Sequence, residues 1–201
     1  MSHVRASKQE LKRQRDALSR FQRYLPTLQL KKRQLQMEIR RVEAKERKAE
    51  AELAAAEREL EPWVALLADD LPLEEHLGIA EVRLTTTNIA GIDVPVLEDL
   101  DFARTVPELH ATPPFFDDAI AACEALSRLR QERRVLAEQR ALLADELRVT
   151  SQRVNLFEKV KIPEAERAIR TIRIALGDQQ AAEVVRAKIA KAKTLEQGVA
   201  T

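Results

Sequence analysis

The sequence predicts a mainly α-helical protein in which a long N-terminal arm and a long C-terminal arm form an antiparallel two-helix coiled coil around a small β-hairpin-containing insert. Three observations predict this fold. Apolar residues recur at steps of three and four through both ends of the 201-residue chain, and the period changes to two in the middle. Charged residues make up 33% of the chain and aromatic residues only 3%. Such a composition forms apolar seams one or two side chains wide and not a thick core.

The N-terminal arm is expected at residues 7–67. Ser7, followed by Glu10, provides a capping box at its start. The apolar residues beyond it occupy two positions of a heptad repeat, which is typical of a coiled coil. The first position holds Leu11, Leu18, Leu25, Ile39, Leu53 and Leu60, and the second holds Phe21, Leu28, Leu35, Val42, Ala49 and Ala56.

The C-terminal arm is expected at residues 117–196, with Asp117 or Asp118 as the N-cap. Because each arm needs the other to bury its apolar stripe, two arms joined by a compact insert should lie antiparallel. Gly177 and a slip in the repeat predict that the helix is not uniform near its end. The expected seam is Ala122, Leu126, Leu129, Leu136, Leu143, Leu147, Val154 and Phe157, resuming at Ile169, Ile172 and Leu176.

The insert, residues 68–116, is acidic and contains a strand pattern. Residues 61–118 carry 13 Asp and Glu against 2 Lys and Arg, whereas both arms are basic. Val82, Leu84 and Thr86 alternate with polar residues, and Gly91 supplies the positive φ that a tight turn needs. A β-hairpin is therefore expected at about 81–97. Pro95 predicts that its second strand is an edge strand.

The sequence contains none of the motifs that would indicate catalysis. It has no phosphate-binding loop, no GxGxxG turn and no HExxH, and its three histidines are scattered at positions 3, 76 and 110. The lone cysteine, Cys123, is expected to be a small apolar residue. The longest stretch without charge has nine residues, against the roughly 20 that cross a bilayer. No enzyme activity, cofactor, metal site or membrane insertion is therefore expected.

Three blocks of sequence resemble a known family. They are SKQELKRQRDAL with YLPTLQLKKRQL in residues 7–35, NIAGIDVP in residues 88–95, and TSQRVNLFEKVKIPEAERAIRTI in residues 150–172. Their order and spacing are similar to the D subunit, the central rotor stalk of V-type and archaeal-type ATPases, and YLPTLQLKK is similar to a bacterial variant. The C-terminal region departs from the family pattern, because GDQQAAEVVRAKIAKAK is not strongly acidic.

The resemblance implies a non-catalytic rotor subunit that transmits torque between an ATP-processing ring and an ion-translocating membrane ring. Catalytic and nucleotide-binding subunits would surround the paired termini, a small F subunit would bind the side of the shaft, and an adaptor subunit would meet the insert. The protein would be cytoplasmic and peripheral to the membrane, with no nucleic-acid partner. The family-motif positions that would serve the shaft and its partner contacts are Leu25, Pro26, Leu28, Lys31, Leu35, Gly91, Gln152, Arg153, Val154, Asn155, Glu158 and Pro163.

Two other functions fit a helical pair with a hairpin. A prefoldin-like chaperone would also join two helices through β-hairpins, but its arms usually expose apolar tips, whereas the tips here are basic and polar. A basic coiled-coil protein that associates with nucleic acid would bind duplexes in a strongly salt-dependent way. Nothing in the insert favours the second alternative.

Overall fold

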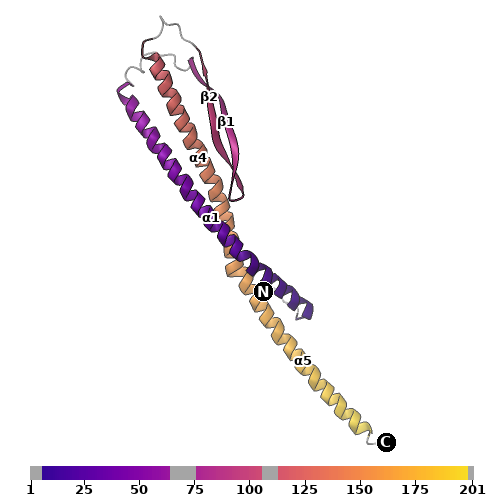
Figure 1. Cartoon of the computed structure of the whole chain (residues 1–201). Coiled ribbons are helices and arrows are strands. Elements are labelled where there is room, and N and C mark those ends of the chain that lie inside the picture. The colour runs from indigo at the N-terminus through magenta and orange to yellow at the C-terminus, as the bar shows by residue number, and fades with distance from the viewer. Residues whose placement is uncertain (1–5, 64–75, 106–112, 199–201) are drawn as a thin grey trace. The chain divides into compact units, whose positions relative to one another are not determined.

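The computed structural model describes residues 6–63, 76–105 and 113–198. Most of these residues are helical, and one two-stranded antiparallel hairpin interrupts the helices, which confirms the predicted fold class (Figure 1). The chain divides into two compact units, one formed by residues 1–30 with 150–201 and the other by residues 31–149. Each unit is described by itself below.

Helix α1 spans Lys8–Leu60. The predicted capping box forms at its start, because the backbone N–H of Glu10 donates to Ser7 Oγ at 3.2 Å. The helix continues through Pro26 and ends in a short 3₁₀ turn, Glu61–Trp63. The expected continuation of the arm over residues 64–67 lies outside the described residues.

The C-terminal arm comprises helix α4, Phe116–Leu156, and helix α5, Ile162–Gly198, joined by a π-helical segment, Phe157–Lys161. The π segment directly precedes Pro163. Here the N–H of Ile162 donates to the carbonyl oxygen of Phe157, five residues back. Pro163 has no N–H to continue the regular ladder, and a π-bulge accommodates the carbonyl groups that it leaves.

Helix α5 runs through Gly177 without a break, so the prediction of irregular structure there was wrong. A glycine inside a helix costs about 1 kcal/mol relative to alanine. Ala175, Leu176 and Ala181 on either side of it are among the best helix formers, so the surrounding sequence still favours a helix.

The unit formed by residues 31–149 contains an apolar seam between its helices. Both helices and the hairpin contribute to it, and its residues occur at heptad spacing along α1. Leu35, Leu143 and Val94 are fully buried. The whole cluster is Leu35, Val42, Ala49, Val94, Leu136 and Leu143.

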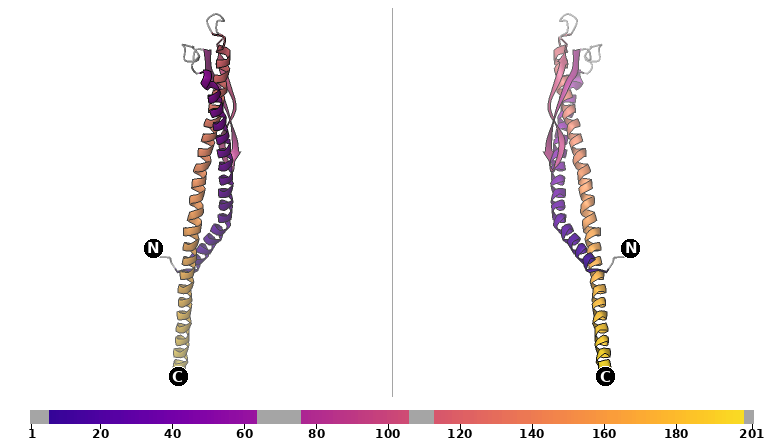
Figure 2. Two further views of the ribbon diagram at one scale, coloured as in Figure 1. Left: turned by 90° about the vertical axis from the view of Figure 1, so that its left-hand side faces the viewer. Right: turned by 90° about the vertical axis from the view of Figure 1, so that its right-hand side faces the viewer.

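Ion pairs across this seam show that α1 and α4 are antiparallel within this unit, where the two helices lie side by side (Figures 1 and 2). Lys31 pairs with Glu146 at 2.7 Å, and Arg130 pairs with Glu57 at 3.1 Å. As the residue number rises along one helix, it falls along the other. Each pair bridges the edge of the apolar seam and is partly exposed, so it fixes register more than it stabilises the fold.

The other unit, residues 1–30 with 150–201, has its own seam. The rings of Phe21 and Phe157 lie 5.2 Å apart, centroid to centroid. Val154, Ala165 and Ile172 are buried along the α4–α5 arm. The predicted stripe beyond Pro163 is therefore an internal face.

The hairpin is formed by β1, Leu77–Ile89, and β2, Ile92–Arg104. It is longer than the predicted 81–97. Pairing runs from Ile89↔Ile92 at the turn to Leu77↔Arg104 at the base, with two irregularities on the way. These irregularities break the simple alternation on which the prediction depended.

Leu143→Asp should destabilise the protein by about 3 kcal/mol or more, because it places a charge in a fully buried position. The matched control is Leu142→Asp on the same helix, since Leu142 is 39% exposed. Thermal and urea unfolding of the two variants measure the difference. Equal losses would show that this seam is not what holds the two helices together.

Candidate interaction surfaces

The candidate functional features of the described residues are exposed surfaces and the ion pairs that hold the hairpin. Within residues 6–63, 76–105 and 113–198, no group of three or more His, Cys, Asp or Glu side chains could hold a metal ion. The described helices include none that is long and apolar enough to cross a membrane.

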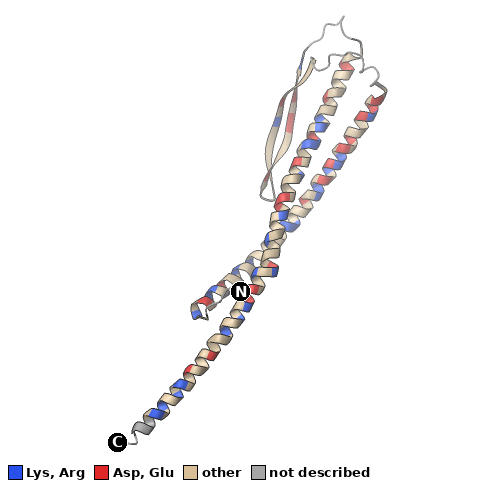
Figure 3. Ribbon diagram, turned by 180° about the vertical axis from the view of Figure 1, so that it is seen from behind, with Lys and Arg blue, Asp and Glu red and all other residues tan. Residues whose placement is uncertain are grey.

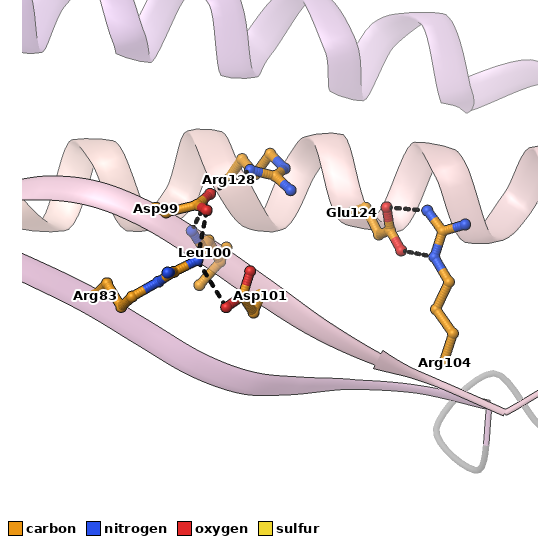
Figure 4. Close-up of polar contacts among 7 residues, drawn as sticks. All are labelled: Arg83, Asp99, Leu100, Asp101, Arg104, Glu124 and Arg128. Carbon is orange, nitrogen blue, oxygen red and sulfur yellow. Dashed lines mark hydrogen bonds and ion pairs between the residues drawn. The ribbon is translucent and has the colours of Figure 1, made fainter.

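The hairpin stands edge-on against α4, with β2 next to the helix and β1 farther away (Figures 1 and 4). Near the turn, the side chain of Gln139 donates from Nε2 to the carbonyl oxygen of Pro95 at 2.6 Å. Val94 enters the seam between the helices. Pro95 does lie on an edge strand, as predicted, but α4 covers that edge.

Arg83 and Arg128 form ion pairs with carboxylates of β2 (Figure 4). Arg83 pairs with Asp99 at 2.7 Å and with Asp101 at 2.9 Å, and Arg128 approaches Asp99 at 3.5 Å while lying over the Phe102 ring. The nearby Asp101 charge raises the pKa of Arg83. These contacts join both strands to α4.

The pKa of Asp99 is lowered by its neighbours at this site. The backbone N–H of Leu100 donates to Asp99 Oδ1 at 2.8 Å, and this hydrogen bond is the main cause that lowers the pKa of Asp99. The charges of Arg83 and Arg128 lower the pKa further. Asp99 is therefore ionised over the whole neutral range.

The base of the hairpin is held by a bidentate ion pair between Arg104 and Glu124 of α4 (Figure 4). The Nε and Nη2 atoms of Arg104 donate to the two Glu124 oxygens at 2.5 and 2.6 Å. This pair lowers the pKa of Glu124 and raises that of Arg104. Glu124 is 9% exposed, so without the arginine its charge would be poorly compensated.

The motif positions of α1 fall into internal and external groups. Leu35 is buried, Leu25 and Leu28 are half-buried, and Pro26 is exposed. Lys31 makes the ion pair with Glu146 across the seam. Leu35 and Lys31 therefore join α1 to α4.

Gly91 lies at the hairpin turn, as its sequence context predicted. Ala90 and Gly91 form the two-residue loop, with φ of 54° and 82°. Both angles are positive, as a type I′ turn requires. Asn88 Oδ1 accepts from the Gly91 N–H at 3.0 Å, and Ala90 packs against the apolar cluster.

The family-motif positions of the third block include one buried residue and an exposed polar group. Val154 is buried, Pro163 is half-buried, and the remaining motif residues are exposed. Those exposed residues are Gln152, Arg153, Asn155 and Glu158. They are available to a partner, whereas Gly91 belongs to the other unit of the chain.

The distal part of α5 has no cover from its own chain among the described residues. Every residue from 177 to 194 is exposed. These residues include Val184, Val185 and Ile189, each more than half exposed. Charged residues of both signs occur along α5, and basic residues predominate from Arg186 to Lys193 (Figure 3).

Comparison with known proteins identifies the family. The family model of the ATP synthase D subunit matches residues 10–192. The chain belongs to the ATP synthase D-subunit family. The V-type ATP synthase D subunit of Borreliella burgdorferi is 40% identical over 196 residues, covering 98% of this chain and 97% of that protein. The corresponding protein of Chlamydia caviae is 34% identical, covering 96% and 94%.

Membership of this family confirms the resemblance carried by the three sequence blocks. Both relatives match over nearly their whole lengths, so the similarity includes the two arms and the insert. As a member of the family, the chain is a structural component of a larger ATPase complex. The contacts of Arg104, Arg128 and Gln139 were not anticipated, because they depend on the hairpin register.

Glu124→Gln should loosen the base of the hairpin and remove an acid-sensitive component of stability. The folded-state pKa of Glu124 is lowered, so its contribution is fully present above its ordinary pKa of 4.5 and is lost as pH falls through the lowered value. Melting temperatures at pH 7 should be lower for the variant, and the difference should shrink in acid. A difference that is constant from about pH 7 to about pH 3 would contradict this role.

Gly91→Ala should destabilise the hairpin turn by about 1–2 kcal/mol, because an L-residue is strained at a φ of 82°. No atom lies within 4 Å of the added methyl group, so steric overlap does not contribute. The control is Gly78→Ala, which is also free of close neighbours and lacks a positive φ. Equal chemical-denaturation midpoints for the two variants would contradict the account of the turn.

Proposed function

We propose that this protein is the non-catalytic central-stalk subunit of a rotary V-type ATPase, which transmits torque between the ATP-processing ring and the ion-translocating membrane ring. The family match over residues 10–192 carries this proposal. A torque shaft must be stiff and must not adhere to its bearing. Antiparallel helices joined by a thin apolar seam, with charges of both signs outside, meet these requirements (Figure 3).

The exposed distal part of α5 supports a role inside a ring of other subunits. Residues 177–194 contribute no buried side chain to the fold, yet they carry Val184, Val185 and Ile189. Exposed apolar side chains on an otherwise charged helix fit a partner surface. We assign catalytic and nucleotide-binding subunits as the neighbours of this region.

Two further partners, a small F subunit and an adaptor of the membrane ring, are proposed for other parts of the chain. The exposed polar positions Gln152, Arg153 and Asn155 are proposed contacts for a small F subunit on the side of the shaft. The insert end of the chain is proposed to meet an adaptor of the membrane ring. The protein would then be held at the membrane only through the other subunits. The prefoldin-like alternative gains no support, because the relatives that match over nearly the whole chain are ATP synthase components.

Truncation of α5 separates the stability of the chain from its proposed role in coupling ATP hydrolysis to ion pumping. Deletion of residues 178–201 should leave the melting temperature nearly unchanged, because the side chains described there, through residue 194, are exposed. It should abolish ATP-driven ion pumping when the truncated chain is assembled with the other subunits. The isolated full-length chain should neither bind nor hydrolyse ATP.

The matched control keeps the length of α5 and changes its apolar side chains. Val185→Ser with Ile189→Ser should reduce pumping less than the deletion does, whereas Lys188→Ser with Lys191→Ser tests the charged face of the same turns. Full pumping by the deletion variant, or ATP hydrolysis by the isolated chain, would refute the proposed function.

A further inference from the structure

Strand β1 has a free edge that faces away from the rest of its unit. In the two-stranded sheet, β1 pairs only with β2. The outer edge of β2 is directed at α4, because the Pro95 carbonyl oxygen accepts from Gln139. The outer edge of β1 therefore points in the opposite direction. Every β1 residue from 78 to 88 is exposed.

The register identifies the backbone groups at this edge. The residues flanking a two-residue turn, Ile89 and Ile92, exchange hydrogen bonds, and bonded and non-bonded pairs then alternate along the ladder. Thr86 consequently lies in a non-bonded pair opposite Pro95, which has no N–H to donate. The N–H and C=O groups of Leu84, Thr86 and Asn88 point away from β2.

Between Leu84 and Asn88 this edge lacks the usual protection against pairing with another strand, whereas Glu81, Arg83 and a register irregularity lie nearer the base of the hairpin. Natural edge strands are commonly protected by lysine, proline or a bulge. β1 contains no lysine and no proline, and the stretch from Leu84 to Ile89 pairs without irregularity. Leu84 is 50% exposed and Ile79 is 48% exposed.

The charged residues of the hairpin indicate the charge of a segment that could pair with the free edge of β1. Its strands carry five carboxylates, Glu81, Asp93, Glu98, Asp99 and Asp101, against two arginines. Both arginines already pair with acidic residues. Glu98 is exposed, and among the described residues no cation pairs with it. The hairpin therefore carries excess negative charge, with Glu81 on β1 and the other four carboxylates on the neighbouring strand β2.

We infer that the free edge of β1 binds an extended, positively charged segment of another subunit of the ATPase complex, which adds as a third strand. Main-chain hydrogen bonds to Leu84, Thr86 and Asn88 supply affinity, and apolar side chains at alternate positions of the segment contact Leu84 and its neighbours. Basic side chains of the segment neutralise the carboxylates. This inference rests on the proposed function, because the complex supplies the segment.

Backbone hydrogen exchange of the unmodified protein provides the first test. The amides of Leu84, Thr86 and Asn88 should exchange rapidly in the isolated chain and slowly after assembly with the other subunits purified from the native host. Amides of Thr85 and Thr87, which face β2, should be protected in both states. Rapid exchange of the three edge amides in a complex that pumps ions would overturn this inference and leave the proposed function intact.

Thr86→Pro provides the second test, because it removes an outward N–H without removing a bond to β2. Pro95, directly opposite, shows that the ladder accepts proline at this level. The variant should keep its melting temperature and bind the other subunits about tenfold more weakly, whereas the control Thr86→Val should bind normally. Equal binding by the two variants would overturn the inference.

Two further outcomes would identify a different occupant of the edge or a failure of assembly. If the isolated chain forms a dimer in which the same three amides are protected, the occupant is a second copy and the inference is wrong. If the chain does not assemble with the other subunits at all, the proposed function and this inference fail together. Weaker binding of the unmodified chain at raised salt is expected, because the segment is basic.

Discussion

The apolar seam between antiparallel helices is the constraint on which the rest of the structure depends. In residues 31–149 it is built from single side chains at heptad spacing, such as Leu35, Val42 and Leu143. A seam this narrow buries little area, so it cannot tolerate a charge, and it leaves most of each helix surface to solvent. The protein thereby gains a firm helix pair and an outer surface of mixed charge.

The hairpin breaks the symmetry of this helix pair. Val94 completes the seam, while the Arg104–Glu124 pair and the contacts of Arg128 hold β2 against α4. In this unit α4 is therefore in contact with both α1 and the hairpin, so the two helices are not equivalent. A rotor needs such asymmetry, because each surrounding catalytic site must meet a different face as the stalk turns. The exposed edge of β1 extends the same asymmetry to partner binding.

The heptad pattern was sufficient to predict the two helices, because a helix that buries one stripe needs apolar residues at regular steps of three and four. Ser7 with Glu10 and the turn at Gly91 were also predictable, since each depends on residues close in sequence. The full length of the hairpin was not predictable from the sequence, because irregularities in strand pairing interrupt the alternation of residues near Arg83. Polar contacts such as Gln139 with Pro95 depend on tertiary register and leave no local pattern. Gly177 was misleading, since one glycine does not end a helix among strong helix formers.

Rotation of this protein within its ring is the central claim, and a reversible cross-link tests it most directly. In a Cys123→Ser background, Val185→Cys on the exposed part of α5 would be joined by a disulfide to a cysteine placed in one of the ring subunits. ATP turnover of the complex should stop when the disulfide forms and return when it is reduced. Undiminished turnover by the fully cross-linked complex would contradict the account.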